Sequence, residues 1–61
     1  MEEAEAAIKV NVEDGYSNIL IETDDIEFRD EIVESWLAMG YDLVRIADTD
    51  RLNRAIMRKK V

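Results

Sequence analysis

The sequence predicts an α+β fold with the element order ββαβα: a three-stranded, mainly antiparallel sheet, one amphipathic helix covering one face, and a basic C-terminal helix. Three observations lead to this prediction. An Asp-Gly pair separates two stretches of alternating hydrophobicity, which is typical of a β-hairpin. A stretch with helical periodicity follows and ends at a glycine. A further alternating stretch and a basic segment complete the chain.

Residues 7–22 form the predicted hairpin, with Asp14-Gly15 as a two-residue type I′ turn. The turn sets a register in which Glu13 lies opposite Tyr16. A slip by one residue would turn Lys9 toward the core, so the turn and the hydrophobic pattern agree. In this register one face carries Ile8, Val10, Val12, Ile19 and Ile21 together with Ser17.

The second predicted element is a helix within residues 24–40. Asp24 or Asp25 can cap its start, and with Asp24 as the cap Glu27 completes a capping-box pattern. Gly40 can end it in the left-handed conformation. The apolar side of the helix spans about 180°, wider than the stripe needed for one surface, so we expect contacts with the sheet and also with the C-terminal segment or a second copy. That side comprises Ile26, Phe28, Ile32, Val33, Trp36, Leu37 and Met39.

Arg29 falls within this apolar side, and two interpretations are open. Its aliphatic stem can lie along the apolar surface while the guanidinium reaches water near the sheet edge. Alternatively, the guanidinium anchors a partner's carboxylate.

Residues 41–47 form the third predicted strand, with Val44 and Ile46 on one face and Leu43 and Arg45 on the other. A strand reached through a helix crossover runs parallel to the strand it left. Placed beside the first strand, it gives the sheet order 2-1-3. Asp48-Thr49-Asp50 can then cap a final helix over residues 51–61.

The composition excludes several classes of protein. The 61 residues are expected to form one small domain with a frayed start over residues 1–5, and they include no cysteine and no histidine. Disulfides, zinc sites with cysteine or histidine ligands, and Ser-His or Cys-His catalysis are therefore excluded. No apolar run is long enough to span a bilayer, so we expect a soluble cytoplasmic protein without a cofactor. A core this small without a staple favours self-association, and a homodimer is expected as one possibility.

The formal net charge of −7 is unevenly distributed. Residues 1–34 carry twelve acidic and two basic side chains, whereas residues 35–61 carry three acidic and six basic ones. An acidic surface repels phosphates but suits docking onto a basic protein.

Neither enzymatic nor metal-binding chemistry has a motif here. The carboxylates cluster at a helix start and along a solvent face, where capping and solubility explain them. Asp48 and Asp50 lack the glycine and terminal glutamate of a calcium loop. We therefore expect a non-catalytic protein.

The leading hypothesis is a small acidic protein that binds a partner through the acidic helix face, with two aromatic residues as anchors. Plain solubility of the acidic face and core packing of the aromatic residues are the alternatives. An inhibitor, for example a virus-encoded one, that blocks a basic, nucleic-acid-handling surface is one form of the hypothesis. The candidate residues are Asp24, Glu27, Asp30, Glu31, Glu34, Trp36 and Tyr41.

Two other functions remain open. The basic tail could bind nucleic acid, although no aromatic residues interleave with its charges. The wide apolar side and the tail helix could instead form the interface of a homo-oligomeric structural protein. The candidate nucleic-acid contacts are Arg51, Arg54, Arg58, Lys59 and Lys60.

The stretch from Ile19 to Ile46 resembles in layout the small RNA polymerase inhibitor of phage T7. The shared features are a hairpin, a helix that is acidic at its start with Trp36 near its end, and Gly40-Tyr41 leading into a strand. What the resemblance implies is a small virus-encoded inhibitor.

Overall fold

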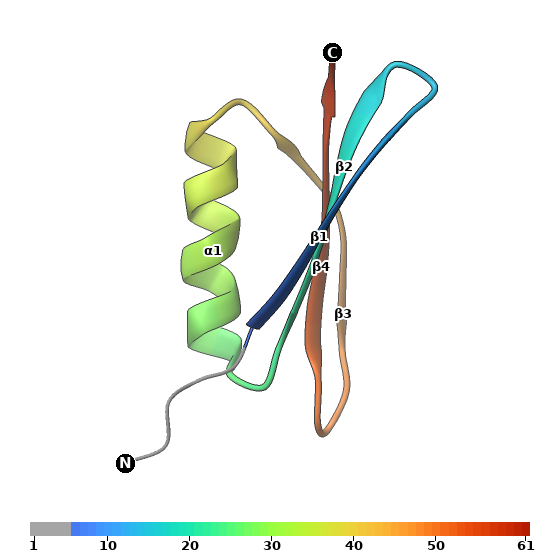
Figure 1. The fold of residues 1–61 in the computed structure, drawn as a ribbon. Coiled ribbons are helices and arrows are strands. Elements are labelled where there is room, and N and C mark those ends of the chain that lie inside the picture. The colour runs from blue at the N-terminus through green and yellow to red at the C-terminus, as the bar shows by residue number, and fades with distance from the viewer. Residues whose placement is uncertain (1–5) are drawn as a thin grey trace.

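The computed structural model describes residues 6–61, so the expected frayed start over residues 1–5 lies outside the described residues. Four strands form one antiparallel sheet in the order β1-β2-β4-β3. One helix, α1, lies against one face of the twisted sheet, and the ribbon of the described residues shows no element on the other face (Figure 1). The elements are β1 (Ala6–Glu13), β2 (Tyr16–Thr23), α1 (Ile26–Ala38), β3 (Asp42–Asp48) and β4 (Asn53–Lys60).

The α+β class and the antiparallel sheet are confirmed, but the predicted C-terminal helix is wrong. Asn53–Lys60 forms strand β4, which makes four strands where three were expected. Ala55 and Met57 are fully buried, and Ile56 between them faces the other side. The burial of the segment thus follows the period of two that a strand requires. As a strand, the segment hydrogen-bonds the second edge of β2, which a surface helix would leave unpaired.

The predicted strand order 2-1-3 is also wrong. β2 lies between β1 and β4, and β1 is an edge strand. β3 does run parallel to β2, as a helix crossover requires, but β4 lies between them and is antiparallel to both. The prediction treated the tail as a helix, so it had no strand to place between β2 and β3. It therefore put β3 beside β1.

The predicted hairpin is confirmed in full register. Glu13 pairs with Tyr16, and Ile8 pairs with Ile21. Asp14 and Gly15 have φ angles of 52° and 80°. Positive φ at both central residues is the requirement of a type I′ turn, which matches the twist of the flanking strands.

The helix is confirmed, with its cap one residue later than the capping-box pattern indicated. Asp25 is the N-cap, and its Oδ1 accepts hydrogen bonds from the backbone N–H groups of Glu27 (2.9 Å) and Phe28 (3.2 Å). Gly40 has a φ of 93° and follows the C-cap residue Met39. The glycine therefore ends the helix as expected.

The core lies between α1 and the middle of the sheet. Helix α1 packs on β2, β4 and β3. Ile32, Trp36 and Tyr41 surround the core. Because the helix is narrower than four strands, apolar side chains on the outer strands stay exposed, among them Ile8, Val10 and Val12 on β1 and Leu43 and Ile46 on β3. The core residues are Ile19, Ile21, Val33, Ala55 and Met57.

The expected division of β3 between faces is wrong because the strand contains a bulge. Leu43 pairs with Met57 and Arg45 with Ile56, so the register shifts at the residue between them, Val44. The extra residue of a bulge changes the alternation of side chains. Leu43 and Ile46 consequently share the helix side of the sheet, opposite Met57 and Ala55.

Deletion of residues 51–61 is expected to abolish folding, because it removes the strand that joins β2 to β3. Unfolding is monitored by Trp36 fluorescence and circular dichroism, and the deleted chain should show no cooperative transition. A control chain with threonine at 54, 58 and 60 keeps the strand but removes its outward charges, and it should still unfold cooperatively. Cooperative unfolding of the deleted chain would contradict the assignment of β4.

Candidate functional site

The outer side of α1 carries a surface of carboxylates. Glu27, Asp30, Glu31 and Glu34 are all exposed, whereas Arg29 and Val33 on the opposite side are buried. The helical period thus keeps these four carboxylates together on the solvent side, as predicted. We call them the acidic helix face.

Arg29 lies beneath this face and binds carboxylates of its own chain. Its side chain is buried, so the expectation that the guanidinium reaches water is wrong. The guanidinium donates from Nε and Nη2 to Oδ1 of Asp30, at 3.0 and 2.7 Å, and from Nη1 to Oδ1 of Asp48 on β3. It therefore ties α1 to the edge of the sheet and neutralises part of the acidic helix face at Asp30. Glu27, Glu31 and Glu34 are left as its outward charges.

Trp36 and Tyr41 belong to the edge of the core. Their rings meet edge to face, with centroids 5.1 Å apart. The Tyr41 hydroxyl lies 2.8 Å from Ser17 Oγ, and both aromatic residues pack against the core cluster. These contacts favour the core interpretation of the two residues over that of partner anchors.

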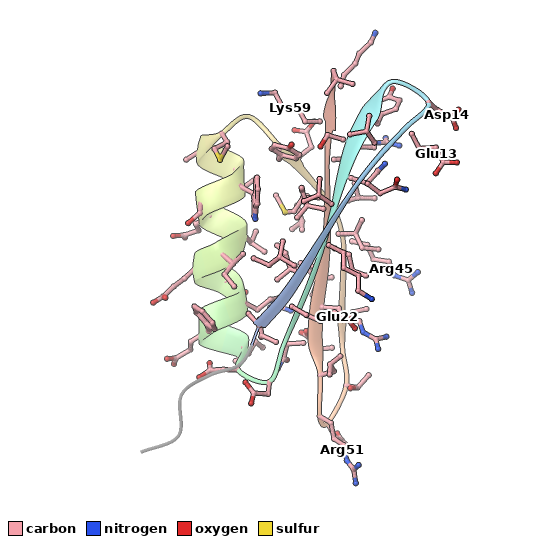
Figure 2. The ribbon with its side chains drawn as sticks, viewed as in Figure 1. Glu13, Asp14, Glu22, Arg45, Arg51 and Lys59 are labelled. Atoms are coloured by element: carbon pink, nitrogen blue, oxygen red, sulfur yellow. The ribbon has the colours of Figure 1, made fainter. Side chains whose placement is uncertain are left out.

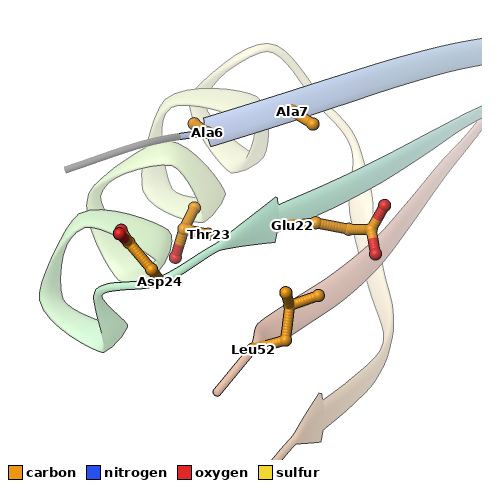
Figure 3. Close-up of a pocket in the computed structure, with 6 residues that line it drawn as sticks. All are labelled: Ala6, Ala7, Glu22, Thr23, Asp24 and Leu52. Carbon is orange, nitrogen blue, oxygen red and sulfur yellow. The ribbon is translucent and has the colours of Figure 1, made fainter.

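Asp24 lies apart from the other candidate carboxylates, in the connection between β2 and α1. It lines a pocket of about 280 Å³ where β1 begins and β2 ends (Figure 3). The other lining residues are Ala6, Ala7, Glu22, Thr23 and Leu52. Around this pocket lie two alanines, a leucine, two carboxylates and Thr23, whose hydroxyl is bonded to the backbone of Asp25. These groups form no arrangement that indicates a reaction.

The five basic residues proposed as nucleic-acid contacts are divided among three places. Arg54, Arg58 and Lys60 alternate along β4 and lie on the sheet face opposite α1. Lys59 points toward the connection between α1 and β3, and Arg51 lies at the turn between β3 and β4 (Figure 2). They do not form one surface.

The face opposite α1 gains two basic side chains from elsewhere in the chain. Lys9 on β1 and Arg45 on β3 share this open face with Arg54, and Figure 2 shows Arg45 pointing away from the helix. Sequence reasoning missed both residues as part of a basic surface. The alternation of side chains along a strand indicates the face on which each residue lies. Only when β4 is also a strand do Lys9 and Arg45 share a face with its arginines.

The open face is mixed in character. Arg54 Nε donates to Glu22 Oε2 at 2.9 Å, and the Arg58 guanidinium lies 4.4 Å from the centre of the Tyr16 ring. Between these polar groups, Leu20 and Ile56 line a shallow depression of about 480 Å³. The face therefore combines an apolar floor with cationic walls, opposite in charge to the acidic helix face.

In the part of the chain that the structure describes, no three carboxylates converge in an arrangement suited to a metal ion. Within the same residues, no helix is long and apolar enough to cross a membrane. Comparisons with protein-family models, with curated proteins and with solved structures found no match. The assignment of candidate sites therefore rests on the geometry of the described residues and not on a known relative.

Asp48→Asn is expected to lower the free energy of unfolding by about 1–3 kcal/mol, because it leaves the buried Arg29 with Asp30 alone. Arg29→Met should cost less, since methionine fills the space and the partly exposed Asp48 carboxylate can be hydrated. Urea denaturation measures both changes.

Asp42→Asn on the same strand is the control and should change stability by less than about 0.5 kcal/mol. A larger loss for Arg29→Met than for Asp48→Asn would contradict this account of the buried ion pair.

Proposed function

We propose that this protein is a non-catalytic interaction protein that docks its acidic helix face onto a basic surface of a partner protein. The observation that carries the proposal is the exposure of Glu27, Glu31 and Glu34 on one side of a helix whose only basic residue is buried. A negative surface with no competing cation speeds and orients association with a positive partner.

The rigidity of the helix supports the same proposal. Its start is held by the Asp25 cap, its middle by the buried Val33, and its link to β3 by Arg29. A surface held in place on a regular element loses little conformational freedom on binding. The carboxylates can therefore be presented to a partner in a fixed spacing.

Occlusion is the mechanism that follows from this surface. A basic groove that handles nucleic acid attracts phosphates, and a helix bearing carboxylates at regular intervals competes for the same cations. In this form the protein is an inhibitor, and virus-encoded inhibitors are one class that fits its size and charge.

The double variant Glu31→Lys, Glu34→Lys should weaken the complex about tenfold or more, because two attractive contacts become repulsive. The partner is captured from native lysate on the immobilised protein, and its affinity is then measured by titration calorimetry at low and high salt. The exposed positions predict an unchanged fold, to be checked by circular dichroism.

The matched control is Asp42→Lys with Asp50→Lys, which changes the net charge equally but away from the helix. Affinity that is the same for the wild type and the helix variant at low salt would rule out the acidic helix face.

Nucleic-acid binding remains the second candidate, now through the open face and not through a terminal helix. The observation that favours it is the sharing of that face by Lys9, Arg45 and the outward side chains of β4. Single strands bind such faces through phosphate contacts and base stacking. Tyr16, half-buried beside Arg58, is the one aromatic side chain among the described residues of that face available for stacking.

If the open face binds nucleic acid, Arg45→Glu with Lys60→Glu should abolish a mobility shift of a single-stranded oligonucleotide at about 50 mM salt. Arg51→Glu with Lys59→Glu makes the same change in charge off this face and should retain the shift. Absence of any shift with the wild-type protein would end this candidate. Truncation of the tail is no test of it, because the truncation removes β4.

A further inference from the structure

Strand β1 is an exposed sheet edge that has neither a bulge nor a proline. All eight of its residues pair with β2 in an unbroken register, and it contains no proline and no bulge. The opposite edge, β3, is interrupted by the bulge at Val44. Proteins commonly protect edge strands against pairing with other chains by bulges, prolines or charges. One edge of this sheet is therefore interrupted by a bulge, whereas the other is continuous and carries only the charges of Lys9 and Glu13.

The side chains of β1 also leave an apolar surface exposed along this edge. Ile8, Val10 and Val12 lie on the helix side of the sheet and are 45%, 60% and 64% exposed. Helix α1 packs over β2, β4 and β3 and leaves them uncovered. Three neighbouring aliphatic side chains on one edge strand are typical of a surface that is covered in the functional state.

The backbone of β1 offers hydrogen bonds at the same positions. The residues that flank a two-residue hairpin turn, Glu13 and Tyr16, exchange hydrogen bonds with each other. The backbone N–H and C=O groups of successive residues point to alternate edges of a strand. Those of Val12, Val10 and Ile8 therefore point to the free edge. Within the described residues no other strand pairs with that edge.

We propose that β1 pairs antiparallel with β1 of a second copy of this chain, which joins the two four-stranded sheets into one continuous sheet. One register of the two strands sets opposite charges across from each other. With Asn11 opposite Asn11 of the second copy, Lys9 lies opposite Glu13 of that copy, and the twofold axis repeats the pair. Opposite charges directly across a strand pair stabilise it, and like charges destabilise it.

The same register also pairs two of the three apolar residues. Val10 lies opposite Val12 of the second copy, and these are residues whose backbone groups face the edge. A shift of both strands that sets Asn11 opposite Ala7 of the copy would place Lys9 against Lys9, which charge repulsion disfavours. Pairing about a twofold axis also closes the assembly, so it stops at two chains.

The dimer goes beyond the proposed docking function and does not depend on it. Because a twofold axis perpendicular to the sheet keeps its faces, both helices lie on the same side of the joined sheet. The two acidic helix faces would then be presented together, and a partner with two basic sites would gain from this arrangement by avidity.

Sedimentation equilibrium on the full chain tests the dimer, with an expected mass of twice 7.1 kDa. Lys9→Glu and Glu13→Lys should each weaken association about tenfold, because each variant sets like charges against each other twice. An equimolar mixture of the two variants should restore the dimer, since every cross-strand pair between positions 9 and 13 then joins one glutamate to one lysine. Arg45→Glu on β3 is the matched control and should leave the mass unchanged.

Val10→Pro provides a second test, because it removes a backbone donor from the free edge and keeps the ladder with β2. Circular dichroism checks its fold, and where that variant fails to fold the charge mixture decides. A wild-type mass of one chain at concentrations up to roughly 1 mM would overturn the proposal. Equal weakening by Lys9→Glu and Arg45→Glu, a mixture no stronger than either variant alone, or a folded Val10→Pro dimer of wild-type strength would also overturn it.

Discussion

The antiparallel pairing of β2 with β4 is the interaction on which the rest of this structure depends. It places Ile19 opposite Met57 and Ile21 opposite Ala55, and all four side chains are fully buried. Helix α1 covers these four side chains and contributes Val33 to the core. A lone hairpin is marginal in water, and among the described strands β3 has no partner other than β4. Residues near the C-terminus are therefore needed to complete a core whose other members lie at positions 19, 21 and 33.

The same pairing rearranges the charge of the molecule. Along the sequence the acidic half precedes the basic half, but β4 lies beside β2, so Arg54 meets Glu22 within the sheet. Arg29, the one cation of the helix, crosses to Asp48 on β3. Both Arg54 and Arg29 thus offset acidic groups inside the chain. What remains is a contrast between two faces: carboxylates on the outer side of α1, and a mixed surface with a cationic rim on the far side of the sheet. The free edge of β1 lies between these two faces.

Candidate site residues that lie on one helix could be grouped correctly from the sequence. Residues brought together by the packing of two elements could not. Glu27, Glu31 and Glu34 lie together because the helical period places them so, and no other described element covers them. The basic residues were wrongly grouped, because neighbours such as Arg58 and Lys59 can lie on one broad polar side of a helix but point to opposite faces of a strand. Arg29 illustrates the same limit. Its place in the apolar side of the helix was evident, but its partner Asp48 is nineteen residues away, and only the packing of α1 on β3 brings the two together.

Local chemistry in the sequence determined the hairpin and the helix. Asp14-Gly15 adopts the positive φ angles that select its turn, and Gly40 ends the helix in the same region of conformational space. Each of these depends on residues that are close along the chain, so each could be predicted from the sequence alone. The tertiary structure decided that residues 53–60 are a strand, that β2 is central and that β3 bulges at Val44. The physical reason is that a short segment with several apolar residues satisfies helix and strand periods almost equally. The free edge of β2, far away along the chain, supplied the hydrogen bonds that favoured the strand.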